Sequence, residues 1–217
     1  MTFHVVELRA VTRVFDRLPA VSQIRLDVTA GETVWLCGSN GSGKSTLLRV
    51  IATALSPTFG TGRVLGFDLR HERDEIRGRL ELLGHQSRFY GELTALENLR
   101  FLARLYGVDP GRASPALERV GLDEVGHVRT ASFSQGMRQR LALARCQMRD
   151  PEIVLLDEPY AGLDVDARVL VDDLLVDAAG RGRTVLVASH EPPPVDAVSR
   201  RVFLEAGRIT VPQPVTP

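Results

Sequence analysis

Residues 38–45 read Gly-Ser-Asn-Gly-Ser-Gly-Lys-Ser and fit the pattern G-x-x-x-x-G-K-[ST]. A short apolar, β-prone run at 33–37 precedes them, and apolar residues recur at helical spacing from 45 to 52. Glycines let successive backbone N–H groups converge on an anion, and the start of a helix favours negative charge. The order strand, loop, helix therefore predicts an α/β domain with a phosphate-binding loop.

Lysine use singles out one position in that loop. The chain has 26 arginines and a single lysine, Lys44. A compact ammonium suits a bridge between the β- and γ-phosphates of a nucleotide better than the larger planar guanidinium does. The hydroxyl of Ser45 is predicted to be a Mg²⁺ ligand. The predicted nucleotide-binding residues of the loop are Gly38, Ser39, Asn40, Gly41, Ser42, Gly43, Lys44, Ser45 and Thr46.

Composition restricts the class of protein. A chain of 217 residues is long enough for one well-cored domain, and its 27 basic residues balance 27 acidic ones. Because no excess positive field exists to hold a polyphosphate backbone, we expect no nucleic acid partner. No apolar run approaches the length of a membrane span, and the first residues lack the pattern of a signal peptide, so we expect a cytoplasmic chain. The two cysteines, Cys37 and Cys146, lie in apolar or helical surroundings and are expected to be buried.

A second apolar run, 153–156, is typical of a buried parallel strand and ends in Asp157 and Glu158. Sites in open α/β sheets form at the carboxyl ends of strands, so these carboxylates are expected to meet the phosphate loop. Asp157 would hold Mg²⁺, and Glu158 would polarise an attacking water. An isolated Asp-Glu-Pro is as readily a surface turn; the phosphate loop is what favours the catalytic interpretation.

Between these two segments lies a predicted capped helix. Ser134 is a good N-cap, and Met137, Leu141, Ala144 and Met148 follow at helical spacing. The N-terminus of such a helix is able to accept an anion, which on its own is an unspecific signal.

Together these motifs resemble the ATP-binding cassette (ABC) ATPases. The phosphate loop, Gln86, Ser134-Gln-Gly136, residues 156–159, residues 161–164 and Ser189-His190 follow the order and spacing of that family over essentially the whole chain. The resemblance implies a P-loop NTPase of ABC type, with a mixed β-sheet core, an antiparallel β-lobe and an inserted helical subdomain. It implies core segments at about 1–86 and 151–210, the helical subdomain at about 87–150, and a frayed tail at 211–217.

The resemblance also assigns roles. In the family two cassettes stack head to tail around two ATP molecules, so the signature residues Ser134, Gln135, Gly136 and Met137 would act on the nucleotide of the partner subunit. The family's commonest signature is Leu-Ser-Gly-Gly-Gln, from which Phe133, Gln135 and Met137 depart. The remaining roles implied are Gln86 at Mg²⁺ and the attacking water, His190 at the γ-phosphate, Asp164 in coupling the two sites, and Phe15 under adenine.

Local patterns add smaller expectations. Thr94 and Glu97 form a predicted capping box that opens a helix ending near residue 106. A Pro- and Gly-rich stretch at 56–62 is predicted to be a turn.

A cassette without membrane spans must act on other subunits. By resemblance, residues 87–93 would line a groove that receives a coupling helix from an integral membrane subunit, which places the chain on the inner face of the membrane. Residues 83–86 and 92–101 are similar to the ATP-binding subunit of the haem exporter of cytochrome c maturation. The alternatives are another small exporter cassette for a drug, polymer or lipid, and a soluble ABC assembly ATPase.

Overall fold

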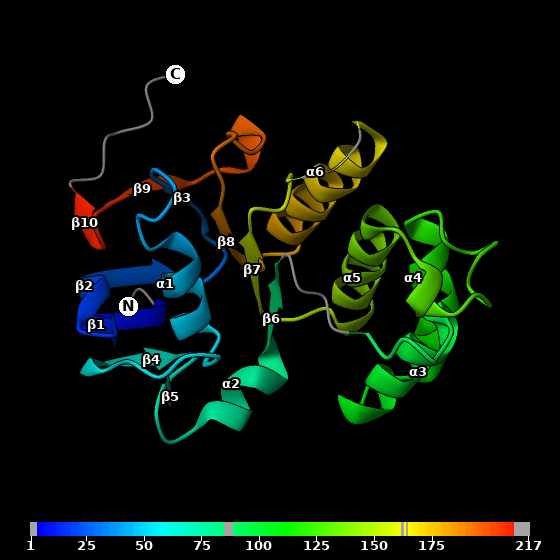
Figure 1. Ribbon diagram of the computed structural model, residues 1–217, viewed down its shortest axis with the longest axis horizontal. Helices are drawn as coiled ribbons and strands as arrows, with labels where there is room; N and C mark the ends of the chain where they lie inside the picture. The colour runs from blue at the N-terminus through cyan, green and yellow to red at the C-terminus, as the bar shows by residue number, and fades with distance from the viewer. Residues whose placement is uncertain (1–3, 85–88, 162, 164, 211–217) are drawn as a thin grey trace.

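The computed structural model describes residues 4–84, 89–161, 163 and 165–210. Its strands form two sheets (Figure 1). The antiparallel sheet has the order β2-β1-β4-β5, and the mixed sheet has the order β10-β9-β3-β8-β7-β6. The strands are β1 (His4–Phe15), β2 (Leu18–Thr29), β3 (Thr33–Cys37), β4 (Phe59–Val64), β5 (Phe67–Asp68), β6 (Leu80–Leu83), β7 (Ile153–Asp157), β8 (Thr184–Ala188), β9 (Arg200–Glu205) and β10 (Arg208–Thr210).

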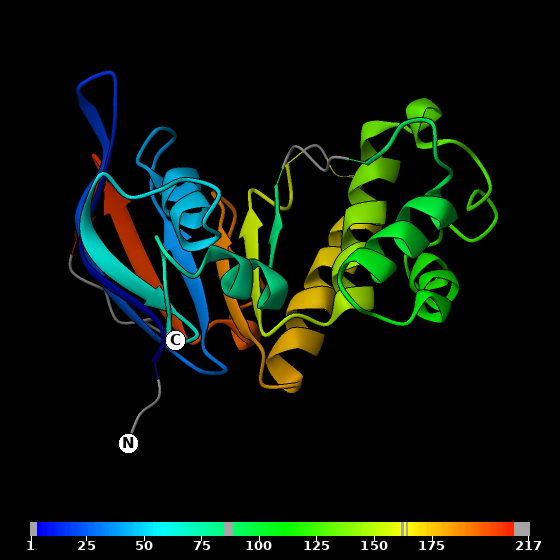
Figure 2. The same ribbon diagram turned by 90° about the horizontal axis from the view of Figure 1, so that it is seen from below.

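Six α-helices lie in the described part of the chain: α1 (Lys44–Ile51), α2 (Arg73–Arg79), α3 (Ala95–Leu105), α4 (Ala113–Arg119), α5 (Gln135–Arg149) and α6 (Val165–Gly180). Single 3₁₀ turns occupy Pro110–Arg112, Thr130–Ser132 and Val195–Ala197. The antiparallel sheet and the group α3, α4 and α5 lie at opposite ends of the molecule, with β6, β7 and β8 between them (Figure 2). This arrangement is the α/β architecture that the sequence predicts; the subdomain boundaries stay a prediction.

The central strands are apolar throughout because both faces of their sheet are covered. Every residue of β3, β7 and β8 is buried, and these strands pair in parallel. Alternate side chains enter two cores. Ile153 and Leu155 pack with α1 and the antiparallel sheet, whereas Val154 and Leu156 pack with α5 and α6.

Two local predictions are confirmed and one is wrong. Thr94 caps α3 with the full capping box, and both cysteines are buried. The turn expected over 56–62 is instead largely strand, because β4 begins at Phe59. Gly62 pairs with Leu8 of β1, and a Cβ at Gly62 would lie 2.8 Å from the Leu8 side chain. Glycine there permits close packing of strands, so its presence does not mark a turn.

Candidate active site

The phosphate loop connects β3 to α1 and is held against two other strands. Gly38 has φ +149° and Gly43 has φ +105°. A Cβ at Gly38 would lie 2.2 Å from the Leu204 carbonyl oxygen of β9, and one at Gly43 would lie 2.5 Å from the Ala20 carbonyl oxygen of β2. Glycine is therefore required at both positions for the loop to keep its shape against the sheets.

Lys44 is the first residue of α1, and its side chain is only 5% exposed. Its Nζ donates to the carbonyl oxygens of Gly38, at 2.7 Å, and Ser39, at 3.2 Å. The same Nζ lies 3.7 Å from Oε1 of Glu158. The ammonium is thus fixed inside the loop and faces the carboxylate that the sequence assigns to catalysis.

Ser45 and Asp157 meet across the sheet edge. Ser45 Oγ donates to Oδ1 of Asp157 at 2.6 Å, and Asp157 is buried at the end of β7. A hydroxyl and a carboxylate oxygen are the donors that Mg²⁺ prefers, and Mg²⁺ commonly takes one or two protein ligands with phosphate oxygens and water completing its shell. The described residues hold no cluster of three or more His, Cys, Asp or Glu side chains arranged for a metal.

Glu158 and His190 lie beside this pair, at the carboxyl ends of β7 and β8. The backbone N–H of Glu158 donates to the Ala188 carbonyl at 2.7 Å. Glu158 has φ +50°, a backbone conformation that residues other than glycine seldom adopt. Its Oε1 lies 3.5 Å from Nε2 of His190, and that imidazole also contacts Oδ1 of Asn40 in the loop. The turn after β7 therefore aims a partly exposed carboxylate at the lysine and the imidazole together, where it is able to polarise a water.

Phe15 ends β1 in a hairpin that lies beside the loop. Arg13 pairs with Val21 across the hairpin, and Val21 Cγ1 would lie 3.0 Å from a Cβ at Gly43. The Phe15 ring is 40% exposed, and the Arg13 guanidinium carbon lies 4.5 Å from its centroid. Sequence reasoning missed Arg13, although its i, i+2 spacing from Phe15 places both side chains on one face of the strand.

The signature residues are far from this cluster. Ser134 caps α5, accepting a hydrogen bond from the Met137 N–H at 3.2 Å, and Ser134 and Gln135 are exposed while Gly136 and Met137 are partly so. In both views β6, β7 and β8 separate α5 from α1 (Figures 1 and 2). The structure thus brings together Asn40, Lys44, Ser45, Asp157, Glu158 and His190, and does not bring residues 134–137 to them. Gln86 and Asp164 lie outside the described residues, and their roles stay predictions.

Comparison with known protein sequences gives related cassettes of several activities. The family model described as ABC transporter matches residues 21–161. The ABC transporter ATP-binding protein NatA of Bacillus subtilis is 35% identical over 190 residues, covering 85% of this chain and 77% of NatA. The cytochrome c biogenesis ATP-binding export protein CcmA of Cupriavidus necator is 39% identical over 171 residues, covering 78% and 75%. The daunorubicin/doxorubicin resistance protein DrrA of Streptomyces peucetius is 33% identical over 209 residues, covering 94% of this chain but only 63% of DrrA.

Solved structures agree with these sequence matches. The dimeric post-hydrolysis structure of the cassette MJ0796 with ADP and Pi has a TM-score of 0.87 and 26% identity, and the match covers 98% of this chain and 99% of that one. The predicted fold is therefore confirmed.

Proposed function

The chain belongs to the ABC transporter family as an ATP-binding cassette, and we propose that two such cassettes hydrolyse ATP to drive a membrane exporter. One observation carries this proposal: Lys44, Ser45, Asp157, Glu158 and His190 converge on one sheet edge from three separate segments. Each has the chemistry that phosphoryl transfer from a nucleotide to water requires.

The proposal gives each side chain a task that its position supports. Lys44 and the backbone N–H groups of the loop bind the β- and γ-phosphates. Glu158 orients a water and accepts its proton as the water oxygen bonds to the γ-phosphorus and ADP leaves, and the His190 imidazole holds the γ-phosphate oxygens. Ser45 and Asp157 would hold Mg²⁺, which would neutralise charge on the phosphates.

A second cassette completes the site. The cap of α5 at Ser134 is exposed, and β6, β7 and β8 separate α5 from the phosphate loop of the same chain (Figures 1 and 2). This arrangement supports a head-to-tail dimer in which residues 134–137 contact the nucleotide of the partner. Two copies of this chain, forming a homodimer, would satisfy this arrangement. The same proposal gives Asp164 the coupling of the two sites, and Gln86 contact with Mg²⁺ and water.

An exposed apolar surface supports docking to an integral membrane subunit. Tyr90 and Phe101 pack edge to face at 5.2 Å and remain 57% and 41% exposed, and Leu105 and Tyr106 follow along α3. Tyr106 also lines a groove of about 360 Å³ whose other walls come from the segment after α1 and from α2, β6 and α5. No helix among the described residues is long and apolar enough to cross a bilayer. We therefore propose a peripheral position on the cytoplasmic face of the membrane.

The cargo we propose first is haem, within the exporter complex of cytochrome c biogenesis. The 39% identity to CcmA of Cupriavidus necator supports it, as do the similarities at residues 83–86 and 92–101. The second candidate is a drug exporter, which the match of DrrA over 94% of this chain favours.

One experiment separates these cargoes. Tagged Glu158→Gln, trapped with ATP in native membranes and gently solubilised, is expected to retain a closed dimer together with membrane subunits. A Soret band in that complex, missing from a parallel Lys44→Ala purification, would support haem. Other membrane subunits without haem would favour the drug exporter, and purification with soluble proteins alone would contradict the exporter proposal.

A further inference from the structure

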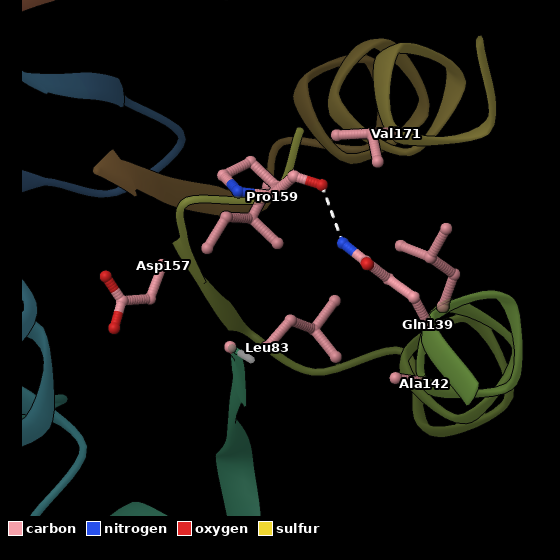
Figure 3. A pocket seen from close by; sticks show the side chains of 9 residues that line it. Leu83, Gln139, Ala142, Asp157, Pro159 and Val171 are labelled. Atoms are coloured by element: carbon pink, nitrogen blue, oxygen red, sulfur yellow. Dashed lines mark hydrogen bonds between the residues drawn. The ribbon is translucent and has the colours of Figure 1, made fainter. Parts of the chain in front are cut away.

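One polar contact connects the signature helix to the catalytic turn of the same chain. Gln139 lies in the second turn of α5, and its Nε2 donates to the carbonyl oxygen of Pro159 at 2.8 Å. Figure 3 shows this hydrogen bond reaching from α5 to the segment after β7, while the carboxylate of Asp157 points away from it. Pro159 directly follows Glu158, so the side-chain amide of Gln139 holds the carbonyl of the residue after the proposed catalytic base.

The surroundings of this contact are apolar and incompletely packed. Leu83, Ala142, Leu143, Leu156 and Val171 line the space around it, and about 20 Å³ there is unfilled. Apolar contacts across such a gap restrain position weakly, because dispersion falls off within a fraction of an ångström. A hydrogen bond in low-dielectric surroundings has a stricter length and direction. Gln139 therefore adds a directional tie between α5 and the turn beside this small cavity.

The opposite end of α5 is anchored by charge. Arg145 lies 2.6 Å from the buried carboxylate of Glu81 in β6, and Arg149 contacts the same carboxylate. Arg149 also donates to the carbonyl oxygens of Leu80, at 3.2 Å, and Gly78, at 3.1 Å. A rigid helix fixed at its C-terminal end moves most at its N-terminal end, where Ser134 and Gln139 lie.

We propose that Gln139 is a positioning residue that transmits displacement of the signature end of α5 to Glu158 within one chain. This inference rests on the proposed function, since the displacement arises when Ser134 and Gly136 contact the nucleotide held by the second cassette. Each site then receives a well-placed base only when its own chain has engaged the nucleotide of the partner. The two sites are coupled through the hydrogen bond from Gln139 to Pro159.

The test compares two like substitutions on one helix. Gln139→Met keeps length and helix propensity but removes the donor, and Gln147→Met makes the same change two turns along α5, at a side chain whose Oε1 is buried without a hydrogen-bond partner. Gln139→Lys restores a donor. For each full-length variant, kcat and the Hill coefficient for ATP hydrolysis, the Kd for ATP and the melting temperature are measured, with Lys44→Ala as the blank.

For Gln139→Met we expect kcat to fall about tenfold or more, because misplacement of a catalytic group by about 1 Å can cost about 100-fold. The Hill coefficient is expected to fall toward about 1 as the coupling between sites is lost, while the Kd for ATP stays unchanged. Gln139→Lys is expected to recover most of the rate, and Gln147→Met to match the wild type.

Wild-type kcat and cooperativity in Gln139→Met would contradict this inference alone, as would an equal loss in Gln147→Met. Wild-type turnover no higher than the Lys44→Ala blank would instead contradict the proposed function. For Gln139→Met, a lower melting temperature together with a Kd for ATP that weakens as much as kcat falls would show a structural role only. That result would also overturn the inference.

Discussion

The phosphate-loop region and the helical region of this chain differ in how complete they are. Around the loop, Lys44, Ser45, Asp157, Glu158 and His190 already contact one another, mostly from buried or half-buried positions. In the helical region Ser134 and Gln135 are exposed at the end of α5, and β6, β7 and β8 separate that helix from α1 and the loop (Figures 1 and 2). The contacts of the phosphate-loop region are formed within one chain, whereas the helical region leaves its signature residues exposed to another molecule.

This difference separates binding from turnover. Changes in the loop region should affect nucleotide binding by a single chain, because the contacts there are already formed. Changes at the signature should affect hydrolysis and leave single-chain binding intact. Nucleotide binding is measurable through Trp35, the single tryptophan, which lies three residues before the loop and donates to the Ser189 carbonyl next to His190. Hydrolysis is measured by phosphate release.

The largest expected effect is at Lys44. Lys44→Ala should weaken ATP binding at least about 30-fold, since truncating one member of a buried charged contact costs roughly 2–5 kcal/mol. Lys44→Arg should fail similarly, because the ammonium is enclosed by the Gly38 and Ser39 carbonyls, and a planar guanidinium does not fit there. Trp35 fluorescence titration measures the Kd. Arg49→Ala, which removes an exposed cation from the same helix, is the control, and an equal loss there would contradict a specific role for Lys44.

The next effect concerns Ser134. Ser134→Ala should lower kcat by about tenfold to 100-fold with unchanged ATP binding, because it removes a contact made only in the closed dimer. It also removes an N-cap, which costs about 1 kcal/mol of stability. Thr94→Ala, which removes the cap of α3, is the matched control and should keep its kcat.

A mixture of two defective chains sharpens the same comparison. A hybrid dimer of a Ser134→Ala chain and a Lys44→Ala chain contains one site with both residues intact and one site lacking both. ATP-dependent formation of a hybrid dimer in the mixture, with neither variant dimerising alone, would support the head-to-tail arrangement, because one intact site needs the loop of one chain and the signature of the other. A mixture that forms no hybrid dimer with ATP would contradict it.

A smaller effect is expected at the hairpin beside the loop. Phe15→Ala should weaken ATP binding about tenfold, since stacking of a base on an aromatic ring contributes about 1–3 kcal/mol. Arg13→Ala should weaken it a few-fold, because the guanidinium covers one face of the ring and donates to the Ser56 carbonyl at 3.1 Å. Inorganic tripolyphosphate has no base, so its Kd, obtained by competition, should not change. Equal losses for both ligands would mean that these substitutions disturb the phosphate loop instead.

The two regions also differ in how well the sequence predicts them. The loop, Asp157 and Glu158 were predictable because each directly follows a continuous apolar strand, and parallel strands end at one edge. The cap at Ser134 was predictable because capping is local. The contact of Arg13 with Phe15 was missed although their i, i+2 spacing is a local signal. The contact of Gln139 with Pro159 was not predictable, because it depends on how separate elements pack.

The smallest effect tests the junction between the two regions. Asp150 ends α5 with φ +51°, and its carboxylate accepts hydrogen bonds from Arg183, which precedes β8, at 2.7 and 3.2 Å. The hydrogen bond from Arg183 lowers the pKa of Asp150 below its ordinary value of 3.8. The stability that this pair contributes is therefore fully present above the unfolded-state pKa and is lost as the pH falls through the lower folded-state pKa.

Asp150→Asn keeps a residue that tolerates the left-handed backbone and removes the charge. It should lower the free energy of unfolding by about 1 kcal/mol at about pH 7, and the difference from the wild type should shrink as the pH falls below about 4. Urea denaturation at several pH values measures both, with Asp173→Asn, at an exposed aspartate of α6, as the control. A loss of unfolding free energy that does not change with pH would assign the effect to the backbone at residue 150. A loss that shrinks as the pH falls would show that a charge pair joins the helical region to the sheet. Such a pair would hold the C-terminal end of α5 in place while its signature end moves.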